Sequence, residues 1–336
     1  MPVAAAPTDD ELLDLLGGDG IDGEVVGLRR RPYSYATSAP LEEISVRTRN
    51  GEGPPLILKD LSRDRLIGDA AETKPDFLYE PRREIETYRR ILSPLDLGPD
   101  FVAASSGGRL PHEHHWLVIA KVSGVELWQI GDPATWDAAA RWLGELHARF
   151  QGRTTQLREA NPHLLEHSAS WFRSWCERAC SALTGSDDDR GPKLIAALDR
   201  YDEVAERLAS LPATLVHGEF YPSNILVEGA GSGEVEMRPV DWEMAALGPG
   251  LIDLAALVGG WDDAGRRRLL TAYRYGLEAG GGRLGVDSVV VADLSRCRLQ
   301  LALQWIGWSS AWRPPREHAH DWLGEARDMT AELGLT

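Results

Sequence analysis

The sequence predicts an α+β protein with a small, antiparallel β-rich N-terminal lobe over residues 1–121 and a larger α-rich C-terminal lobe over residues 122–336. The chain has 336 residues, more than one typical domain of about 100–200 residues. Extended apolar segments separated by turn signals dominate its first third, with one helical stretch among them. Helical periodicity dominates the remainder, so we expect strands and helices to be largely segregated.

The N-terminal lobe begins with an acidic helix over residues 9–16, which ends at two glycines. Alternating extended segments then predict a sheet, and the dipeptide Asn50-Gly51 predicts a hairpin within it. A proline at position 81 and apolar residues at helical spacing predict one helix inside this lobe. The expected strands span residues 24–30, 41–49, 55–59 and 115–120, and the expected helix spans residues 80–92.

The C-terminal lobe is expected to be mainly helical, with short strands in its middle. An Asp-Pro pair at 132–133 predicts the start of its first long helix. Helices are predicted over residues 133–150, 168–183 and 193–210, and short strands over residues 215–219, 225–227 and 237–240. Further helices are expected from Gly248 to the tail near Glu332.

Composition excludes several classes of function. The chain has 36 Lys+Arg against 52 Asp+Glu, a net charge of −16, which disfavours binding to nucleic acid and to anionic membranes. No apolar run reaches the roughly 18 residues of a membrane span, and residues 1–10 lack the pattern of a signal peptide. Three cysteines cannot form a disulfide framework, so we expect a cytoplasmic protein.

Two polar segments in the C-terminal lobe carry the predicted chemistry. The first is His217-Gly218-Glu219, with Asn224 five residues after Glu219, and the second is Asp241-Trp242-Glu243 after an apolar strand. An amide and a carboxylate from these segments can bind Mg²⁺, which prefers oxygen ligands and needs few protein groups when substrate phosphates are present. Glu219 then remains to accept a proton from a hydroxyl, an arrangement suited to phosphoryl transfer.

These segments resemble the motifs of the aminoglycoside phosphotransferase family, whose fold is similar to that of protein kinases. The family's H-G-D-x-x-x-x-N loop is matched from His217 to Asn224, with Glu219 in place of the aspartate. Its D-W-E segment, followed by G-x-x-x-x-D-L-A, is matched from Asp241 and from Gly248. The resemblance covers about residues 24–330 in order, and it implies a protein-kinase-like two-lobe fold.

The resemblance also implies a role for particular residues. Lys59 would hold the nucleotide phosphates, and Glu84 would orient Lys59, although Glu80 and Glu86 compete for that role. Asn224 and Asp241 would bind Mg²⁺, Glu219 would be the catalytic base, and His217 would order the loop. The resemblance further implies nucleotide contacts at Ser34, Ala120 and Val122 and bracing of the catalytic loop by Asp253. Glu243 would make either a metal contact or a structural hydrogen bond.

The implied reaction transfers the terminal phosphoryl group of ATP or GTP to a hydroxyl of a small acceptor. The acceptor could be an antibiotic, as in a resistance enzyme, or a sugar, an amino alcohol or a biosynthetic intermediate. Glu219 leaves a second interpretation open, a nucleotide-binding pseudokinase with a regulatory or scaffolding role. Four C-terminal tryptophans could form either a helical core or the wall of an acceptor pocket: Trp305, Trp308, Trp312 and Trp322.

Overall fold

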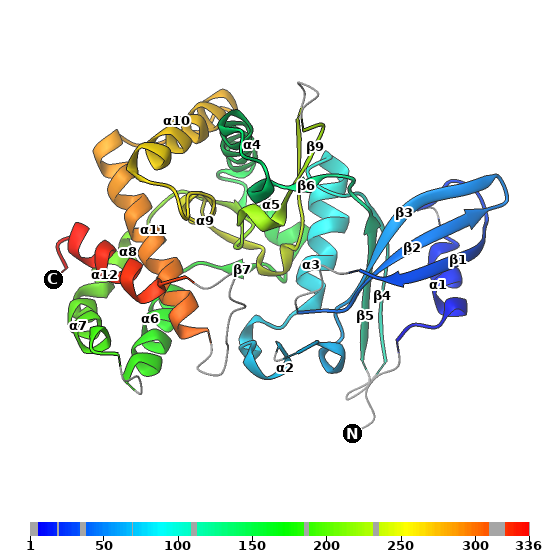
Figure 1. Ribbon diagram of the computed structural model, residues 1–336, viewed down its shortest axis with the longest axis horizontal. Helices are drawn as coiled ribbons and strands as arrows, with labels where there is room; N and C mark the ends of the chain where they lie inside the picture. Colours follow the sequence, from blue (N-terminus) through cyan, green and yellow to red (C-terminus); the bar gives the residue numbers. More distant parts are fainter. Residues whose placement is uncertain are drawn as a thin grey trace. The chain divides into compact units, whose positions relative to one another are not determined.

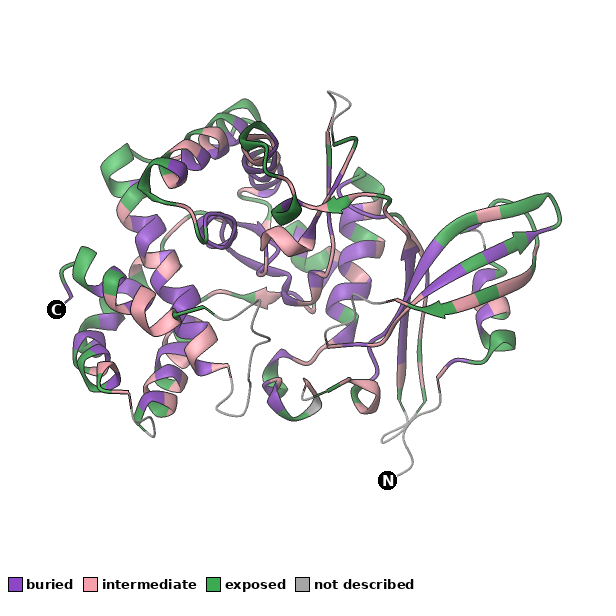
Figure 2. Cartoon of the chain, in the orientation of Figure 1, coloured by how far each residue is buried: buried purple, intermediate pink, exposed green. Residues whose placement is uncertain are grey.

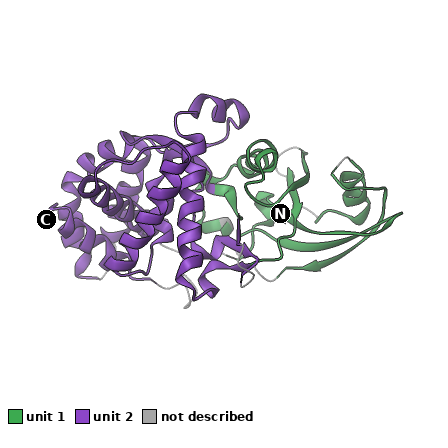
Figure 3. Cartoon of the chain, turned by 90° about the horizontal axis from the view of Figure 1, so that it is seen from above, with its two compact units in different colours: residues 1–124, 238–243 green, residues 125–237, 244–336 purple. Residues whose placement is uncertain are grey.

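The computed structural model of the chain describes residues 6–18, 20–33, 38–68, 70–108, 113–184, 188–230, 235–308 and 320–335. The chain forms two compact units, residues 1–124 with 238–243 and residues 125–237 with 244–336 (Figure 3). A five-stranded antiparallel sheet dominates the first unit and helices dominate the second, which confirms the predicted α+β fold class. The segment 238–243 returns to the first unit from late in the sequence.

The first unit is built on a sheet of strand order β1-β2-β3-β5-β4, drawn in blue to teal in Figure 1. Each neighbouring pair of strands is antiparallel, and the predicted Asn50-Gly51 hairpin joins β2 to β3. The strands are β1 (Val25–Pro32), β2 (Leu41–Thr48), β3 (Gly51–Asp60), β4 (Phe101–Gly107) and β5 (His114–Ala120). Short helical segments connect β3 to β4, namely Arg63–Arg65, α2 (Ala70–Thr73), Asp76–Leu78, α3 (Pro81–Thr87), Tyr88–Leu92 and Ser93–Leu95.

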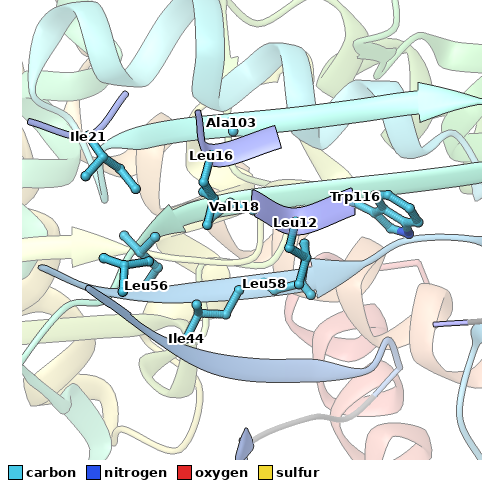
Figure 4. Close-up of a cluster of buried hydrophobic side chains, with 10 residues drawn as sticks. Leu12, Leu16, Ile21, Ile44, Leu56, Leu58, Ala103, Trp116 and Val118 are labelled. Atoms are coloured by element: carbon cyan, nitrogen blue, oxygen red, sulfur yellow. The ribbon is translucent and has the colours of Figure 1, made fainter. Parts of the chain in front are cut away.

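Both faces of the central strands are covered. Helix α1 (Asp9–Leu16) is fixed by a capping box between Thr8 and Glu11 and buries Leu12 and Leu16. These two leucines form a core cluster with alternate residues of the sheet (Figure 4). From the strands and the loop after α1 this cluster takes Ile21, Ile44, Val46, Leu56, Leu58, Ala103, Trp116 and Val118.

Strand periodicity places the polar site on the opposite face of the same sheet. Because side chains alternate along a strand, Leu56 and Leu58 on the α1 side require Lys59 to point to the other side. Helix α3 packs there, against β5. It begins with Pro81 after Glu80, whose side chain accepts a hydrogen bond from the Arg82 N–H. Lys59 therefore lies on the face opposite the α1 cluster, beside the buried apolar residues Ile57 and Leu117 of that face.

The second unit is a bundle of helices around short strands. Its central helices α9 and α11 are buried over most of their length, and all of α9 is purple in Figure 2. Helix α4 packs closely along α10, and α11 packs against α6, α9 and α12. The helices are α4 (Pro133–Phe150), α5 (Thr154–Ala160), α6 (Ala169–Thr184), α7 (Arg190–Ala197), α8 (Tyr201–Ala209), α9 (Leu251–Leu257), α10 (Asp263–Ala279), α11 (Asp287–Gly307) and α12 (Trp322–Glu332).

The short strands of this unit carry the loops of interest. β11 (Ala246–Pro249) pairs with β8 (Ala213–Val216) and with β7 (Leu165–Glu166). β9 (Ile225–Glu228) pairs with β6 (Val125–Glu126), and β10 (Glu236–Pro239) completes that sheet. The 3-10 turn Pro222–Asn224 precedes β9, and another, Leu127–Gln129, follows β6. No helix within the described ranges is long and apolar enough to cross a bilayer.

The observed elements differ from the predicted ones at several places. The strand expected over residues 215–219 is β8, which ends at Val216. The helix expected over residues 193–210 is two helices, α7 and α8, separated by a 3-10 turn at Leu198–Arg200. Apolar residues at helical spacing on both sides of the turn conceal it in the sequence. Strand β4 was not predicted, because its last five residues, Ala-Ala-Ser-Ser-Gly, have little of the β-branched or aromatic composition typical of strands.

Candidate active site

Lys59 is the centre of a charged site in the first unit. It lies near the end of β3 with only 8% of its surface exposed. Its Nζ atom is 2.8 Å from the nearer carboxylate oxygen of Glu84 and 2.7 Å from Oδ1 of Asp241. One ammonium group thus contacts two carboxylates that are far apart in the sequence.

Glu84 is the helix glutamate that reaches Lys59. It lies in α3 and is 2% exposed. Glu86, on the same helix, instead pairs with Arg89 and Arg90, and Glu80 caps the helix start. Of the three glutamates considered from the sequence, the structure therefore brings Glu84 to the lysine.

Burial and neighbouring charges shift the pKa values of Glu84 and Lys59 in opposite directions. Burial raises the pKa of Glu84 to about 7, although the charge of Lys59 opposes the shift. For Lys59, burial lowers the pKa, but the carboxylates of Asp241, Glu84 and Glu243 more than offset this and hold it well above its usual value. Lys59 consequently stays positively charged at neutral pH.

Asp241 follows β10 in a left-handed backbone conformation, with φ of 65°. Aspartate tolerates this region better than most residues with a side chain. The next residue, Trp242, is fully buried and donates its indole N–H to the carbonyl of Pro239, which fixes the turn. The Asp241 side chain is 27% exposed, so a buried anchor places a partly accessible carboxylate beside Lys59.

Glu243 has a partner that the sequence did not suggest. Its Oε2 atom is 2.6 Å from Nζ of Lys74, and its backbone carbonyl accepts a hydrogen bond of 2.6 Å from Arg83. Lys74 is one of only four lysines in the chain, which is the one signal that could have singled it out. These contacts tie the segment after Asp241 to α3 and to the segment between β3 and α3.

Residues 217–224, called here the catalytic loop, follow β8 in the second unit. Gly218 has φ of 85°, and a Cβ atom there would lie 2.4 Å from the carbonyl oxygen of Met244. Only glycine satisfies both conditions. The Glu219 N–H donates to Nδ1 of the buried His217 at 3.3 Å, and the Glu219 carbonyl accepts from the amide of Asn224 at 3.0 Å. The side chains of His217 and Asn224 therefore both bind the backbone of Glu219 directly.

Asp253, in the first turn of α9, is fully buried and contacts the start of this loop. Its two carboxylate oxygens accept hydrogen bonds from the backbone N–H groups of His217, at 2.7 Å, and Gly218, at 2.9 Å. These are the contacts that the bracing role implied by the resemblance requires.

The implied nucleotide contacts lie at the end of β5. Ala120 is the last residue of the strand, and its N–H donates to the carbonyl of Asp100. Val122 is half-buried and lies beyond the strand. Ser34 lies outside the described residues.

Aromatic side chains connect the catalytic loop to α11. The indole N–H of Trp305 donates to the Tyr221 hydroxyl at 2.6 Å, and Trp305 stacks on Trp322. Trp308 stacks on the buried Trp175 of α6. Part of this aromatic set is therefore helical core and part lies next to the catalytic loop, while Trp312 lies outside the described residues.

The oxygen donors fit Mg²⁺ better than a soft metal. Within the described ranges, no cluster of three or more His, Cys, Asp and Glu side chains could hold a metal ion alone. The Asn224 amide nitrogen is engaged by the Glu219 carbonyl, which leaves the amide oxygen as the group available to a cation. A carboxylate from Asp241 and an amide oxygen from Asn224 are hard ligands of the kind Mg²⁺ uses together with phosphate.

Comparisons with known proteins show the family of the chain. The model of the phosphotransferase enzyme family matches residues 46–286. No curated protein sequence matches the chain.

Solved structures share the fold at low sequence identity. A spectinomycin phosphotransferase in complex with ADP and spectinomycin is 14% identical, with 99% of this chain and 100% of that chain covered and a TM-score of 0.52. A choline kinase from Cryptosporidium parvum Iowa II is 13% identical, with coverage of 91% and 88% and a TM-score of 0.56. A macrolide 2'-phosphotransferase from Brachybacterium faecium is 17% identical, with coverage of 97% of each chain and a TM-score of 0.56.

Proposed function

Because the chain belongs to the phosphotransferase enzyme family, we propose that it transfers the terminal phosphoryl group of ATP or GTP to a hydroxyl of a small molecule. The membership confirms the resemblance to aminoglycoside phosphotransferases. The observation that carries the proposal is the pairing of Lys59 with Glu84 and Asp241. A buried, permanently charged lysine held by a helix glutamate is suited to binding nucleotide phosphates.

At phosphorus, the proposed reaction forms one bond and breaks one. The acceptor oxygen attacks the terminal phosphorus, the bond from that phosphorus to the bridging oxygen breaks, and the nucleoside diphosphate leaves. Glu219 takes the proton of the attacking hydroxyl. Hydrogen bonds to His217 and from Asn224 hold the backbone from which this carboxylate extends. Aspartate and glutamate have similar reference pKa values, so Glu219 can replace the family's aspartate as a base.

Lys59 neutralises charge on the nucleotide phosphates while Glu84 keeps its ammonium in place. Asn224 and Asp241 would hold Mg²⁺, which neutralises phosphate charge and orients the transferred group when bound. Ala120 and Val122 would contact the base through their backbone groups, and Ser34 would be a further nucleotide contact.

The acceptor stays open among an antibiotic, a sugar, an amino alcohol and a biosynthetic intermediate. A cytoplasmic site of action is supported by three free cysteines, Cys176, Cys180 and Cys297, of which two are buried. An intracellular nucleotide donor is consistent with that location.

The test is acceptor-dependent nucleotide consumption by wild type and by Glu219→Gln, with ATP and GTP against a panel of hydroxyl compounds. We expect the variant to keep nucleotide affinity and to lose about 10²–10⁴ in kcat, the usual worth of general-base catalysis. Glu219→Asp should also lose activity, because a shorter side chain misplaces the carboxylate. If wild type and Glu219→Gln are equally silent toward every acceptor while both bind nucleotide, the protein is a pseudokinase.

A further inference from the structure

A buried chain of hydrogen bonds runs behind the catalytic loop, entirely within the second unit. It joins Asp253 of α9, His147 of α4 and Tyr273 of α10, each of them at most 2% exposed. His147 Nε2 lies 3.3 Å from Asp253 Oδ2, and His147 Nδ1 lies 2.9 Å from the Tyr273 hydroxyl. Asp253 is the residue that binds the backbone of His217 and Gly218.

The chemistry of the carboxylate fixes the direction of the bond between His147 and Asp253. The Asp253 carboxylate already accepts two backbone N–H groups, so it accepts from His147 as well and Nε2 must carry a proton. In a neutral imidazole Nδ1 is then an acceptor, and the Tyr273 hydroxyl is its donor. Burial raises the pKa of Tyr273 far above its usual value, so the phenol keeps the proton that it donates.

Glycines make room for this arrangement at three places. A Cβ atom at Gly144 would lie 2.2 Å from the Tyr273 carbonyl oxygen, and one at Gly276 would lie 2.0 Å from the Arg141 carbonyl oxygen. These two glycines let α4 and α10 approach closely, one turn from His147 and from Tyr273 respectively. At Gly250, before α9, a Cβ atom would lie 2.4 Å from His147 Nδ1 and 2.8 Å from the Tyr273 hydroxyl oxygen. The third glycine therefore leaves space for the His147–Tyr273 bond itself.

We propose that Tyr273 and His147 are positioning residues for phosphoryl transfer, acting through Asp253 on the catalytic loop. This inference rests on the function proposed above. Asp253 Oδ2 is shared between the His217 N–H and the imidazole, so the orientation of the imidazole sets the orientation of the carboxylate. The carboxylate holds the two residues directly before Glu219. A small displacement there moves the proposed base, and displacements of about 1 Å can cost a hundredfold in rate.

The variant Tyr273→Phe tests the proposal, since it removes one hydroxyl and keeps the ring. We expect kcat to fall about tenfold with nucleotide KM unchanged, the loss expected for one hydrogen bond that positions a reacting group. Tyr275→Phe is the matched control, because Tyr275 lies on the same helix but is 64% exposed. It should keep wild-type kcat and KM.

A double-mutant cycle separates a role through His147 from a general loss of packing. Tyr273→Phe should cost little in a His147→Phe background, because the bond it removes is already gone. Equal loss from Tyr273→Phe in both backgrounds would overturn the proposal, as would wild-type kinetics of Tyr273→Phe.

A measurement without turnover keeps the proposal testable if His147→Phe does not fold. Amide hydrogen exchange at Gly218 should be faster in Tyr273→Phe than in wild type, while exchange at Leu215 in β8 is unchanged. Unchanged exchange at Gly218 would contradict the proposal. If wild type transfers no phosphoryl group but this exchange effect is present, the proposed function fails and the positioning of the loop stands.

Discussion

Lys59 and the catalytic loop are held by two different kinds of interaction. In the first unit, one ammonium is held by ion pairs to Glu84 and Asp241, and one of these carboxylates is partly accessible. In the second unit, the loop is held by hydrogen bonds from backbone N–H groups to Asp253, whose carboxylate also contacts the buried His147. The first arrangement can exchange a carboxylate for phosphate oxygens, whereas the second keeps one geometry. We infer that ion pairs serve ligand binding at Lys59, whereas hydrogen bonds to backbone N–H groups serve the positioning of Glu219.

The largest expected effect comes from removing the accessible carboxylate. Asp241→Asn should reduce turnover by about a thousandfold or more, because a metal's electrostatic stabilisation is worth several kcal/mol and an amide is a poorer Mg²⁺ ligand. Asparagine tolerates the left-handed backbone at this position, so the fold should be kept. Asp96→Asn is the matched control, since Asp96 also has positive φ but pairs with Arg238. If Asp241→Asn keeps wild-type turnover at saturating Mg²⁺, Asp241 is not a metal ligand.

Lys59→Ala should have the next largest effect on kinetics. We expect a higher nucleotide KM and a kcat lowered by about 10²-fold, since charge-assisted contacts to the phosphates are lost. The melting temperature is the companion measurement, because the variant leaves the buried Glu84 without its cation. Unchanged nucleotide binding would show that Lys59 does not contact the phosphates.

Glu84→Gln should reproduce the kinetic defect of Lys59→Ala more mildly, about tenfold in kcat/KM, by releasing the lysine from its helix anchor. Glu86→Gln, two residues away on the same helix, should be silent because Glu86 pairs with Arg89 and Arg90 and not, among the described residues, with Lys59. A damaged Glu86 variant beside an unaffected Glu84 variant would reverse this assignment.

Lys74→Met tests how far the ion-pair network supports Asp241. Lys74 and Glu243 have side-chain exposures of only 9% and 16%, so breaking the pair should destabilise the fold by about 1–3 kcal/mol. We expect only a few-fold loss in kcat, because Trp242 still anchors the turn. Thermal unfolding measures the first effect, with Lys193→Met, at an exposed lysine, as the control. A melting temperature equal to that of the control would show that the pair contributes nothing.

The last effect concerns the pH dependence of stability and not turnover. His167 packs beside Trp171 and Phe172, and its Nδ1 atom is buried with no hydrogen-bond partner among the described residues. Burial lowers the pKa of His167 from 6.5 to about 4. Between pH 6.5 and pH 4, the side chain is therefore protonated in the unfolded chain and neutral in the folded chain. Stability should therefore fall as pH drops from 6.5 toward 4.

The shift in pKa contributes about 2 kcal/mol to the loss in free energy of unfolding. This value is smaller than the full shift would give, because the ring is partly exposed to solvent. His167→Phe should remove that part of the acid loss, whereas His163→Phe should not. Denaturant unfolding at pH 7 and pH 4.5 measures the difference. An identical acid loss in His167→Phe and wild type would contradict the assignment.

The sequence predicted the parts of the site that have short, local signals. The catalytic loop and the Asp241 segment are contiguous motifs, and Lys59 stood out because lysines are rare. Contacts made by long-range packing were not predictable. The Lys74–Glu243 pair joins residues 169 positions apart, and the His147–Tyr273 bond depends on a helix crossing that glycines permit. Glu84 could be separated from Glu80 and Glu86 only once the helix face was known.

Labelled-phosphate transfer tests the central claim most directly. Wild type would be incubated with Mg²⁺, each hydroxyl compound of the panel and ATP or GTP labelled in the terminal phosphoryl group, and the products separated by mass. We expect the label on one acceptor, as a phosphate ester, with Glu219→Gln slowed by about 10²–10⁴. Label that appears only as inorganic phosphate, or nucleotide that is bound but never consumed with any acceptor, would contradict the account.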